Sequence, residues 1–356
     1  MLLSLAAVAG VGAWLAISRL SPEAITAQLQ AALAPVGDVT FPGGGAPRLV
    51  VGLEPRIEFN LIDVAGERLL LVAGRGRYEA GWLNLLTGMG DPGRLLLEAA
   101  VLGRADSRQS WVSVLQILPQ DAGPAVELPD ATFADLPAVQ ETAITLDAQG
   151  RLSAKGAVAR AQENDPPITF ELQLGPGNGG QSRRAALRFE GPDGLELSWS
   201  GRMELGSAFT ATGALELTKD DWRLRAERAG FDAGHPFLAG GILSGPAGRA
   251  NVEADKGAGD AVAVRIGFGA FDAAHLDAAW SALSEFLAQG GGMQPVTVTL
   301  GADVLAWGDT PLARAVALQL EADADGMRMA STRIGLSAGG EIRFEAIPSP
   351  QGDRPG

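Results

Sequence analysis

The chain has 356 residues and a formal net charge of -14 at pH 7, with 42 acidic and 28 basic side chains and no cysteine. This acidic balance argues against binding to a nucleic-acid backbone, because that affinity comes from Lys and Arg. The lack of cysteine excludes disulfides, zinc–thiolate sites, iron–sulfur clusters and thiol catalysis within the chain. The length allows about two domains or one elongated domain.

The first 18 residues contain no charged side chain, and the first charge is Arg19. Such a segment is at the lower limit of what spans a hydrocarbon core of about 30 Å, so we expect a transmembrane anchor over residues 1–18. A cleaved signal peptide and a simple buried helix remain alternatives, although no basic residue precedes the apolar run. Arg19 alone does not set the orientation in a membrane.

Two helices are predicted in the first part of the body. Ser21 and Pro22 are typical of a helix start, and the spacing of Ile25, Leu29 and Leu33 predicts an amphipathic helix over 22–34. A second helix, of about two turns, is predicted over 81–89.

A third helix is predicted over 273–289, after Asp272 as its N-cap. Leu276, Trp280, Leu283 and Leu287 form one apolar stripe along it. We interpret this helix as a lid over the sheet, in preference to a partner-binding helix.

From about residue 48 onward the sequence consists mainly of short runs that alternate between apolar and polar residues, separated by Gly, Pro, Asp and Asn. This period of two is typical of antiparallel strands with one apolar and one solvated face. The predicted fold is therefore mainly β: a long curved antiparallel meander, either a sheet or a groove, with few short helices. The apolar positions are Ile57, Phe59 and Leu61; Ile168, Phe170 and Leu172; Leu195, Leu197 and Trp199; Val296, Val298 and Leu300; and Val316, Leu318 and Leu320.

No domain boundary is evident within residues 19–346, and we treat them as one β-rich body. The stretch 103–130 combines strand-like residues with several prolines and is a weak linker candidate. The Pro- and Gly-containing residues 347–356 are expected to form a disordered tail.

Catalytic motifs are absent from the sequence. His235 and His275 are the only histidines, and neither has a metal-ligand partner three or four residues away. Asp220 and Asp221 lie beside Trp222, but neighbouring strand residues point to opposite faces, so we do not expect their carboxylates to converge. We therefore expect no enzymatic activity, no catalytic residue, no metal and no cofactor.

An apolar sheet face must be covered or must bind something apolar. The predicted helices are too few to cover a long sheet, so the apolar face either packs on itself or forms an elongated groove. In a chain tethered to a membrane, such a groove favours acyl chains as the ligand. The fifteen apolar positions named above are then candidates to line it.

The order of these features resembles the AsmA family of bacterial envelope proteins, which are akin to repeating β-groove, bridge-like lipid-transfer proteins. The resemblance lies in the apolar start, the helix SPEAITAQLQAAL, the strand RIEFNLIDV and the segment LLLVAGRGRYEAGWLNLLTG leading into RLLLEAAVL. It continues in ATGALELTKDDWRLRAERAG and in the last strands, LGADVLAWGDTPLARAVALQLEADADGMRMASTRIGLSAGGEIRFEA.

The resemblance implies a single-pass protein of the bacterial inner membrane with its body in the periplasm. It also implies a role in outer-membrane homeostasis, with phospholipid moving along a β-lined groove and envelope proteins as further partners. No catalytic residue is carried over.

Two other functions stay open at this point. The body could be a structural or protein-interaction module of the envelope, with its apolar face closed by self-packing or by a partner. It could also be an envelope hydrolase or glycan-binding protein, if carboxylates distant in sequence converge in the fold.

Overall fold

The structure is a computed structural model. It describes residues 21–33, 38–42, 47–65, 70–87, 90–103, 124–134, 136, 138–160, 166–176, 182–192, 194–205, 209–232, 235–256, 261–279, 281, 295–323, 326–336 and 339–345. Within these residues the chain is mainly β, with 21 strands in one hydrogen-bonded sheet. The apolar segment 1–18 and the tail 347–356 lie outside the described residues.

The chain divides into two compact units. Unit 1 comprises residues 1–192 and 202–207, and unit 2 comprises residues 193–201 and 208–356. The division falls within strand β12 (Glu196–Leu205). Each unit is described by itself below.

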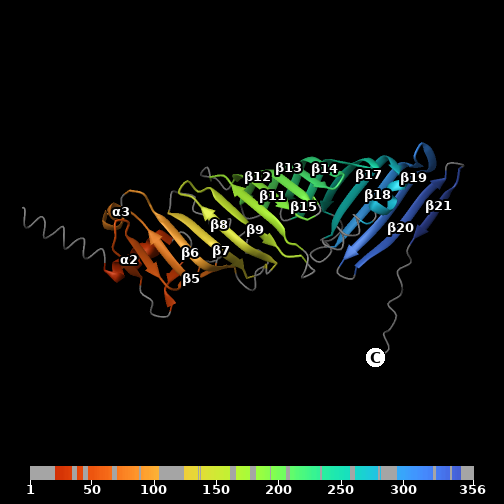
Figure 1. The fold of residues 1–356 in the computed structure, drawn as a ribbon. Coiled ribbons are helices and arrows are strands. Elements are labelled where there is room, and N and C mark those ends of the chain that lie inside the picture. Colours follow the sequence, from red (N-terminus) through yellow and green to blue (C-terminus); the bar gives the residue numbers. More distant parts are fainter. Residues whose placement is uncertain are drawn as a thin grey trace, which may run out of the picture. The chain divides into compact units, whose positions relative to one another are not determined.

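The described residues of unit 1 form two helices and the first eleven strands (Figure 1). Their bounds are α2 (Pro22–Leu33), β1 (Asp38–Thr40), β2 (Arg48–Val50), β3 (Arg56–Phe59), β4 (Ile62–Ala65), β5 (Leu70–Glu79), α3 (Trp82–Thr87), β6 (Arg94–Leu102), β7 (Ala125–Phe133), β8 (Val139–Leu146), β9 (Leu152–Val158), β10 (Ile168–Leu174) and β11 (Ser182–Glu190).

Unit 2 contains the remaining strands and a short 3₁₀ helix (Figure 1). Their bounds are β13 (Phe209–Lys219), β14 (Trp222–Asp232), β15 (His235–Gly245), β16 (Gly248–Lys256), β17 (Val262–Asp272), η2 (Ala273–His275), β18 (Val296–Trp307), β19 (Thr310–Asp323), β20 (Gly326–Leu336) and β21 (Glu341–Glu345).

Most neighbouring strands are consecutive and antiparallel, as the predicted meander requires. In unit 1, β3 and β4 both pair with β5, β5 pairs with β6, and β7 to β11 follow one another. In unit 2, β13 to β17 form one antiparallel run and β18 to β21 form another.

Two parallel pairs interrupt this pattern, which corrects the prediction of a wholly antiparallel meander. β6 pairs with β7 in parallel, and β17 pairs with β18 in parallel. Parallel neighbours need a crossover of a dozen or more residues, in contrast to a hairpin turn. The chain accordingly leaves β6 at Leu102 and enters β7 at Ala125, and it leaves β17 at Asp272 and enters β18 at Val296. The weak linker candidate at 103–130 thus coincides with the first connection up to the start of β7 at Ala125, and the range 273–289 of the predicted helix falls in the second.

The helix α2 begins where the sequence predicts. The Ser21 hydroxyl accepts a hydrogen bond from the Ala24 backbone N–H at 3.2 Å, which caps the first turn. Ile25 and Leu29 are buried, and the Gln30 side chain donates to the Val39 carbonyl at 3.0 Å. The helix therefore packs beside β1 with its apolar side covered.

A local backbone irregularity keeps the apolar residues of β6 on one face where the alternation shifts. In β6 the buried positions are Leu95 and Leu97 before Ala99 and then Ala100 and Leu102 after it. Ala99 has a positive φ of 51°, and its N–H donates to the Asp130 carboxylate of β7 at 2.8 Å. The burial pattern shifts by one residue at this point, so both halves of the strand bury the same face, while the register with β5 continues unbroken.

Gly76 on β5 is required by a close aromatic contact. It lies opposite Phe59 of β3, and a Cβ at this position would overlap the Phe59 ring. We expect Gly76→Ala to lower the free energy of unfolding by about 1–3 kcal/mol, because the ring cannot move without disturbing the core. Urea unfolding measures the effect.

Gly74→Ala is the matched control on the same strand, since a Cβ there would meet Ala99 Cβ at an ordinary 3.6 Å. It should be neutral or slightly stabilising. Equal effects of the two substitutions would contradict this account of Gly76.

Candidate functional site

The candidate site is the apolar face of the sheet, and strand register builds it in rows. In unit 2, Val252, Ile266, Leu300 and Leu318 lie opposite one another on β16 to β19. The next row on the same face comprises Ala254, Val264, Val298 and Leu320. Apolar side chains thus adjoin across strands as well as alternating along them.

A further row crosses more of unit 2. It runs from β13 to β19 through Leu217, Leu224, Leu243, Ala250, Phe268, Ala302 and Val316. Because every member is apolar, this face has no polar interruption along that row.

Unit 1 has the same construction on β9 to β11. One row contains Ala154, Leu172 and Leu187, and the next contains Gly156, Phe170 and Phe189. The rings of Phe170 and Phe189 lie 6.2 Å apart between centroids. A Cβ at Gly156 would crowd the Phe170 ring, so the ring lies over this glycine.

The structure places the predicted groove residues in two groups by burial. Ile57, Phe59, Trp199, Val298 and Leu320 are buried and belong to the core. The others are half-buried: Leu61, Ile168, Phe170, Leu172, Leu195, Leu197, Val296, Leu300, Val316 and Leu318. The half-buried group retains apolar surface that a ligand could cover.

Trp199, one of the buried residues, is held in place by a hydrogen bond. Its indole N–H donates to the Ala229 carbonyl at 2.9 Å, which satisfies the one donor of the ring within the sheet. The side chain therefore has a structural role.

Leu61 lies outside the alternation that was predicted for it. Asn60 and Leu61 separate β3 from β4, and the buried positions move from Ile57 and Phe59 to Ile62 and Val64. Since side chains alternate with a period of exactly two, the break transfers the apolar face to even-numbered residues. Ile62 and Val64 thus continue the buried face at the point where Leu61 was predicted to do so.

The face changes from closed to partly exposed along unit 1. Ile57, Ile62, Leu95 and Leu102 on β3 to β6 are each at most 1% exposed. By contrast, Phe170, Leu172, Leu187 and Phe189 on β10 and β11 are half-buried. The first strands and the two helices thus form a closed core, and the later strands retain accessible apolar surface.

The crossover after β17 begins to cover the face of unit 2. Asp272 caps η2 by accepting a hydrogen bond from the Ala274 N–H at 3.0 Å. Ala279 packs against a cluster that contains Phe268 and Phe271, whose rings meet edge to face at 4.9 Å. Leu276 of the predicted stripe is exposed. Trp280, Leu283 and Leu287 of that stripe lie outside the described residues.

The opposite face carries cross-strand ion pairs. Glu216 of β13 pairs with Arg223 and Arg225 of β14. Arg265 of β17 lies 2.6 Å from Asp255 and 3.6 Å from Glu253 on β16. Exposed pairs of this kind stabilise a fold only slightly, and they make the polar face unsuitable for an apolar ligand.

The candidate carboxylate pair and the two histidines lie in a turn, at a strand end and in a short helix. Asp220 and Asp221 form the turn between β13 and β14, which corrects their assumed place on a strand. His235 lies 2.9 Å from Lys256, which is at one end of β16, and His275 is in η2. Among the described residues, no group of three or more Asp, Glu, His or Cys side chains could hold a metal ion.

One residue of this face was missed by sequence reasoning. Arg183 of β11 is only 4% exposed, and Thr142 is the other buried polar or charged residue of the described part. The alternation of Arg183, Ala185, Leu187 and Phe189 is the sequence signal that places the arginine on the apolar face.

Comparison with known proteins leaves the chain without a family assignment. Searches against protein-family descriptions, curated proteins and solved structures found no match. Within the described residues, no helix has the length and apolar character needed to cross a membrane.

The ion pairs of the polar face predict a pH dependence. The hydrogen bond from Arg223 holds the pKa of Glu216 below its usual value, with further help from the charge of Arg225. A lowered pKa stabilises the fold above the unfolded value of about 4.3 and stops doing so as the pH falls through the folded value. We expect the urea concentration at the unfolding midpoint to fall when the pH is lowered below about 4. It should fall less in the Glu216→Gln variant than in the wild type.

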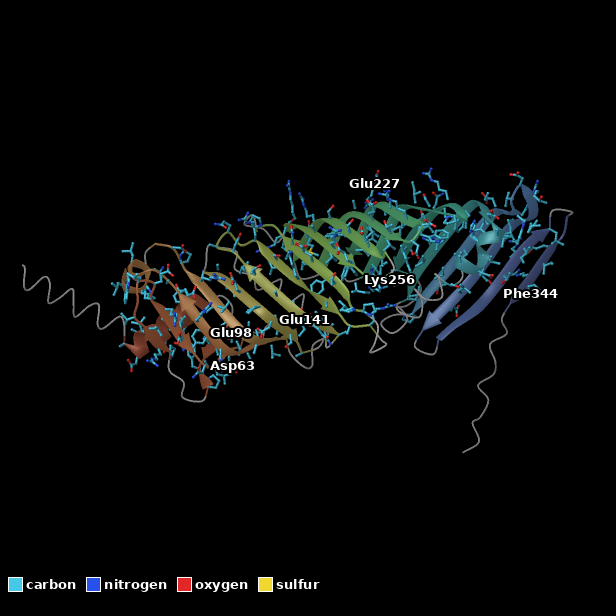
Figure 2. The ribbon with its side chains drawn as sticks, in the orientation of Figure 1. Asp63, Glu98, Glu141, Glu227, Lys256 and Phe344 are labelled. Atoms are coloured by element: carbon cyan, nitrogen blue, oxygen red, sulfur yellow. The ribbon has the colours of Figure 1, made fainter. Side chains whose placement is uncertain are left out.

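Glu227→Gln is the matched control, because Glu227 of β14 makes no ion pair with the described residues (Figure 2). If it reduced the pH dependence as much as Glu216→Gln, the pairing would not be the cause.

Proposed function

We propose that the chain holds phospholipid acyl chains along the apolar face of its sheet and performs no chemical step on them. The observation that supports this best is the set of uninterrupted apolar rows, in which half-buried members such as Ile266, Leu300 and Leu318 lie beside buried ones. Single exposed apolar residues are normal on a soluble protein, but contiguous apolar surface marks a ligand or partner site.

The dimensions of the rows suit an acyl chain. Neighbouring strands lie about 4.8 Å apart, so the row from Val252 on β16 to Leu318 on β19 extends for about 14 Å. Covering such a surface with hydrocarbon gains about 0.8 kcal/mol for each methylene removed from water. Binding therefore needs no polar anchor to be favourable.

In this proposal the body acts in the bacterial periplasm, tethered to the inner membrane by residues 1–18, and serves outer-membrane homeostasis. The uncharged apolar start of the sequence and the resemblance to the AsmA family support this placement. The lipid would move along the sheet in a groove of the AsmA type.

The last strand favours a protein partner as the second candidate function. In the described part, β21 pairs only with β20, and its Phe344 is 58% exposed (Figure 2). Phe344 continues the row of Leu318 through Thr332. An exposed edge strand with apolar side chains is a site at which another chain can add a strand. An envelope protein could close the face there.

Lipid analysis of purified protein tests the proposal. We expect protein prepared without detergent to carry phospholipid that mass spectrometry of an organic extract detects. Leu300→Glu should lower the bound lipid by about tenfold, because a carboxylate in the row opposes hydrocarbon contact. Thr299→Glu is the matched control, since Thr299 is exposed on the other face of the same strand.

Leu300 is preferable to Val298 for this test. Val298 is 1% exposed, so a charge there would unfold the sheet. Leu300→Ala removes apolar contact without adding charge and should lower the bound lipid less. Lipid-free wild-type protein, or equal lipid in the Leu300→Glu and Thr299→Glu variants when both are folded, would contradict the proposal.

A further inference from the structure

A buried arginine lies at the end of the apolar face in unit 1. Arg183 is on β11, and Ala185, Leu187 and Phe189 share its face because side chains alternate along a strand. Ala185 completes the row of Leu146, Leu152 and Leu174 on β8 to β10. Arg183 is the next position beyond that row, so it stands at the rim of the apolar surface.

Arg183 has few partners for a buried cation. Its Nη1 donates to the Gly150 carbonyl at 3.0 Å, and no carboxylate of the described residues forms an ion pair with it. A guanidinium carries five N–H donors, and a neutral carbonyl satisfies only one. Burial lowers the pKa of Arg183. None of its other nitrogen atoms is fully buried without a partner, so the unused N–H groups are still reached by solvent.

The acceptor of Arg183 is held rigidly, which fixes the guanidinium at the rim. Gly150 is in the turn between β8 and β9, with a φ of +75° that favours glycine. The Asp147 carboxylate closes this turn by accepting from the N–H groups of Gln149 and Arg151, each at 2.9 Å. The Arg151 Nε also donates to Asp147 at 2.6 Å.

Asp147, in the same turn as Gly150, forms its hydrogen bonds within that turn. Burial raises the pKa of Asp147, but the hydrogen bonds from Arg151 and Gln149 outweigh that effect and leave the pKa below its usual value. The carboxylate is ionised at neutral pH, and its hydrogen bonds go to the turn. Arg183 keeps unused donors beside the apolar rows.

We propose that Arg183 binds the phosphate headgroup of a lipid whose acyl chain lies on the rows of Leu172 and Phe170. The inference rests on the proposed function, since it assigns the headgroup end of the same surface. A phosphate fits the guanidinium geometry through paired N–H···O bonds and supplies the missing negative charge. Leaving a buried cation without such a partner is costly.

The alternative is a purely structural arginine that ties the β8–β9 turn to β11. That role needs only the hydrogen bond to Gly150, which a neutral amide could also donate. Headgroup binding needs the positive charge. The two roles therefore separate when charge is removed and the donor is kept.

The test compares ligands that differ only in the headgroup. Decyl phosphate, 1-decanol and inorganic phosphate each compete with a fluorescent acyl probe for the full chain. We expect the wild type to bind decyl phosphate about tenfold more tightly than 1-decanol, the usual gain for hydrogen bonds to a charged group. Inorganic phosphate alone should not displace the probe, because it lacks the acyl chain.

Three variants assign the preference to Arg183. Arg183→Gln should abolish the tenfold preference while leaving the 1-decanol affinity unchanged. Arg183→Lys keeps the charge and should retain part of the preference. Arg184→Gln is the matched control, because Arg184 is exposed on the opposite face of β11. Its behaviour should equal that of the wild type.

Other outcomes would contradict the headgroup site, the proposed function or both. A folded Arg183→Gln variant that keeps the preference, or that changes only the thermal midpoint, would show a structural arginine. Binding of 1-decanol without any preference for decyl phosphate in the wild type would overturn the headgroup site and leave the acyl-chain proposal standing. Displacement by inorganic phosphate would show that free phosphate is the ligand. Failure of both decyl ligands to bind would overturn the proposed function as well.

Discussion

The backbone hydrogen-bond ladder between neighbouring strands is the constraint on which the rest of the structure depends. Each strand alternates apolar and polar residues, but alternation alone would not join the apolar positions of different strands. The register does so, for example by setting Ile266 of β17 beside Leu300 of β18 and Leu318 of β19. The same register aligns Arg265 with Glu253 on the opposite face. A slip of one residue in any strand would exchange the two faces.

Local irregularities preserve this segregation of the faces. Ala99 in β6 and Ala315 in β19 both have positive φ and stand where the buried phase shifts by one residue. For residues other than glycine this conformation costs about 1–3 kcal/mol. In β6 the Asp130 carboxylate offsets part of the cost by accepting from the freed Ala99 N–H. The sheet thus accepts local strain where strict alternation would have exposed apolar side chains.

The sequence predicts the class of fold and the identity of most apolar positions, because a period of two is a local property of each strand. It does not predict the parallel pairs β6–β7 and β17–β18, which depend on where the chain returns after a long connection. The sequence also does not predict the phase shift at Leu61, because it depends on a break between β3 and β4 that the local alternation does not reveal. Arg183 was missed because a charged residue at a strand start is normally exposed, and its burial arises from tertiary packing.

The central claim is that the half-buried rows of the apolar face contact lipid. The chain has no cysteine, so single cysteines can be introduced and labelled cleanly. The most direct measurement is the emission of an environment-sensitive fluorophore on Leu300→Cys and on Thr299→Cys while phospholipid is added. We expect phospholipid to shift the emission of the fluorophore to the blue at position 300 and to leave it unchanged at position 299. An unchanged spectrum at position 300 in folded protein, or equal shifts at both positions, would contradict it.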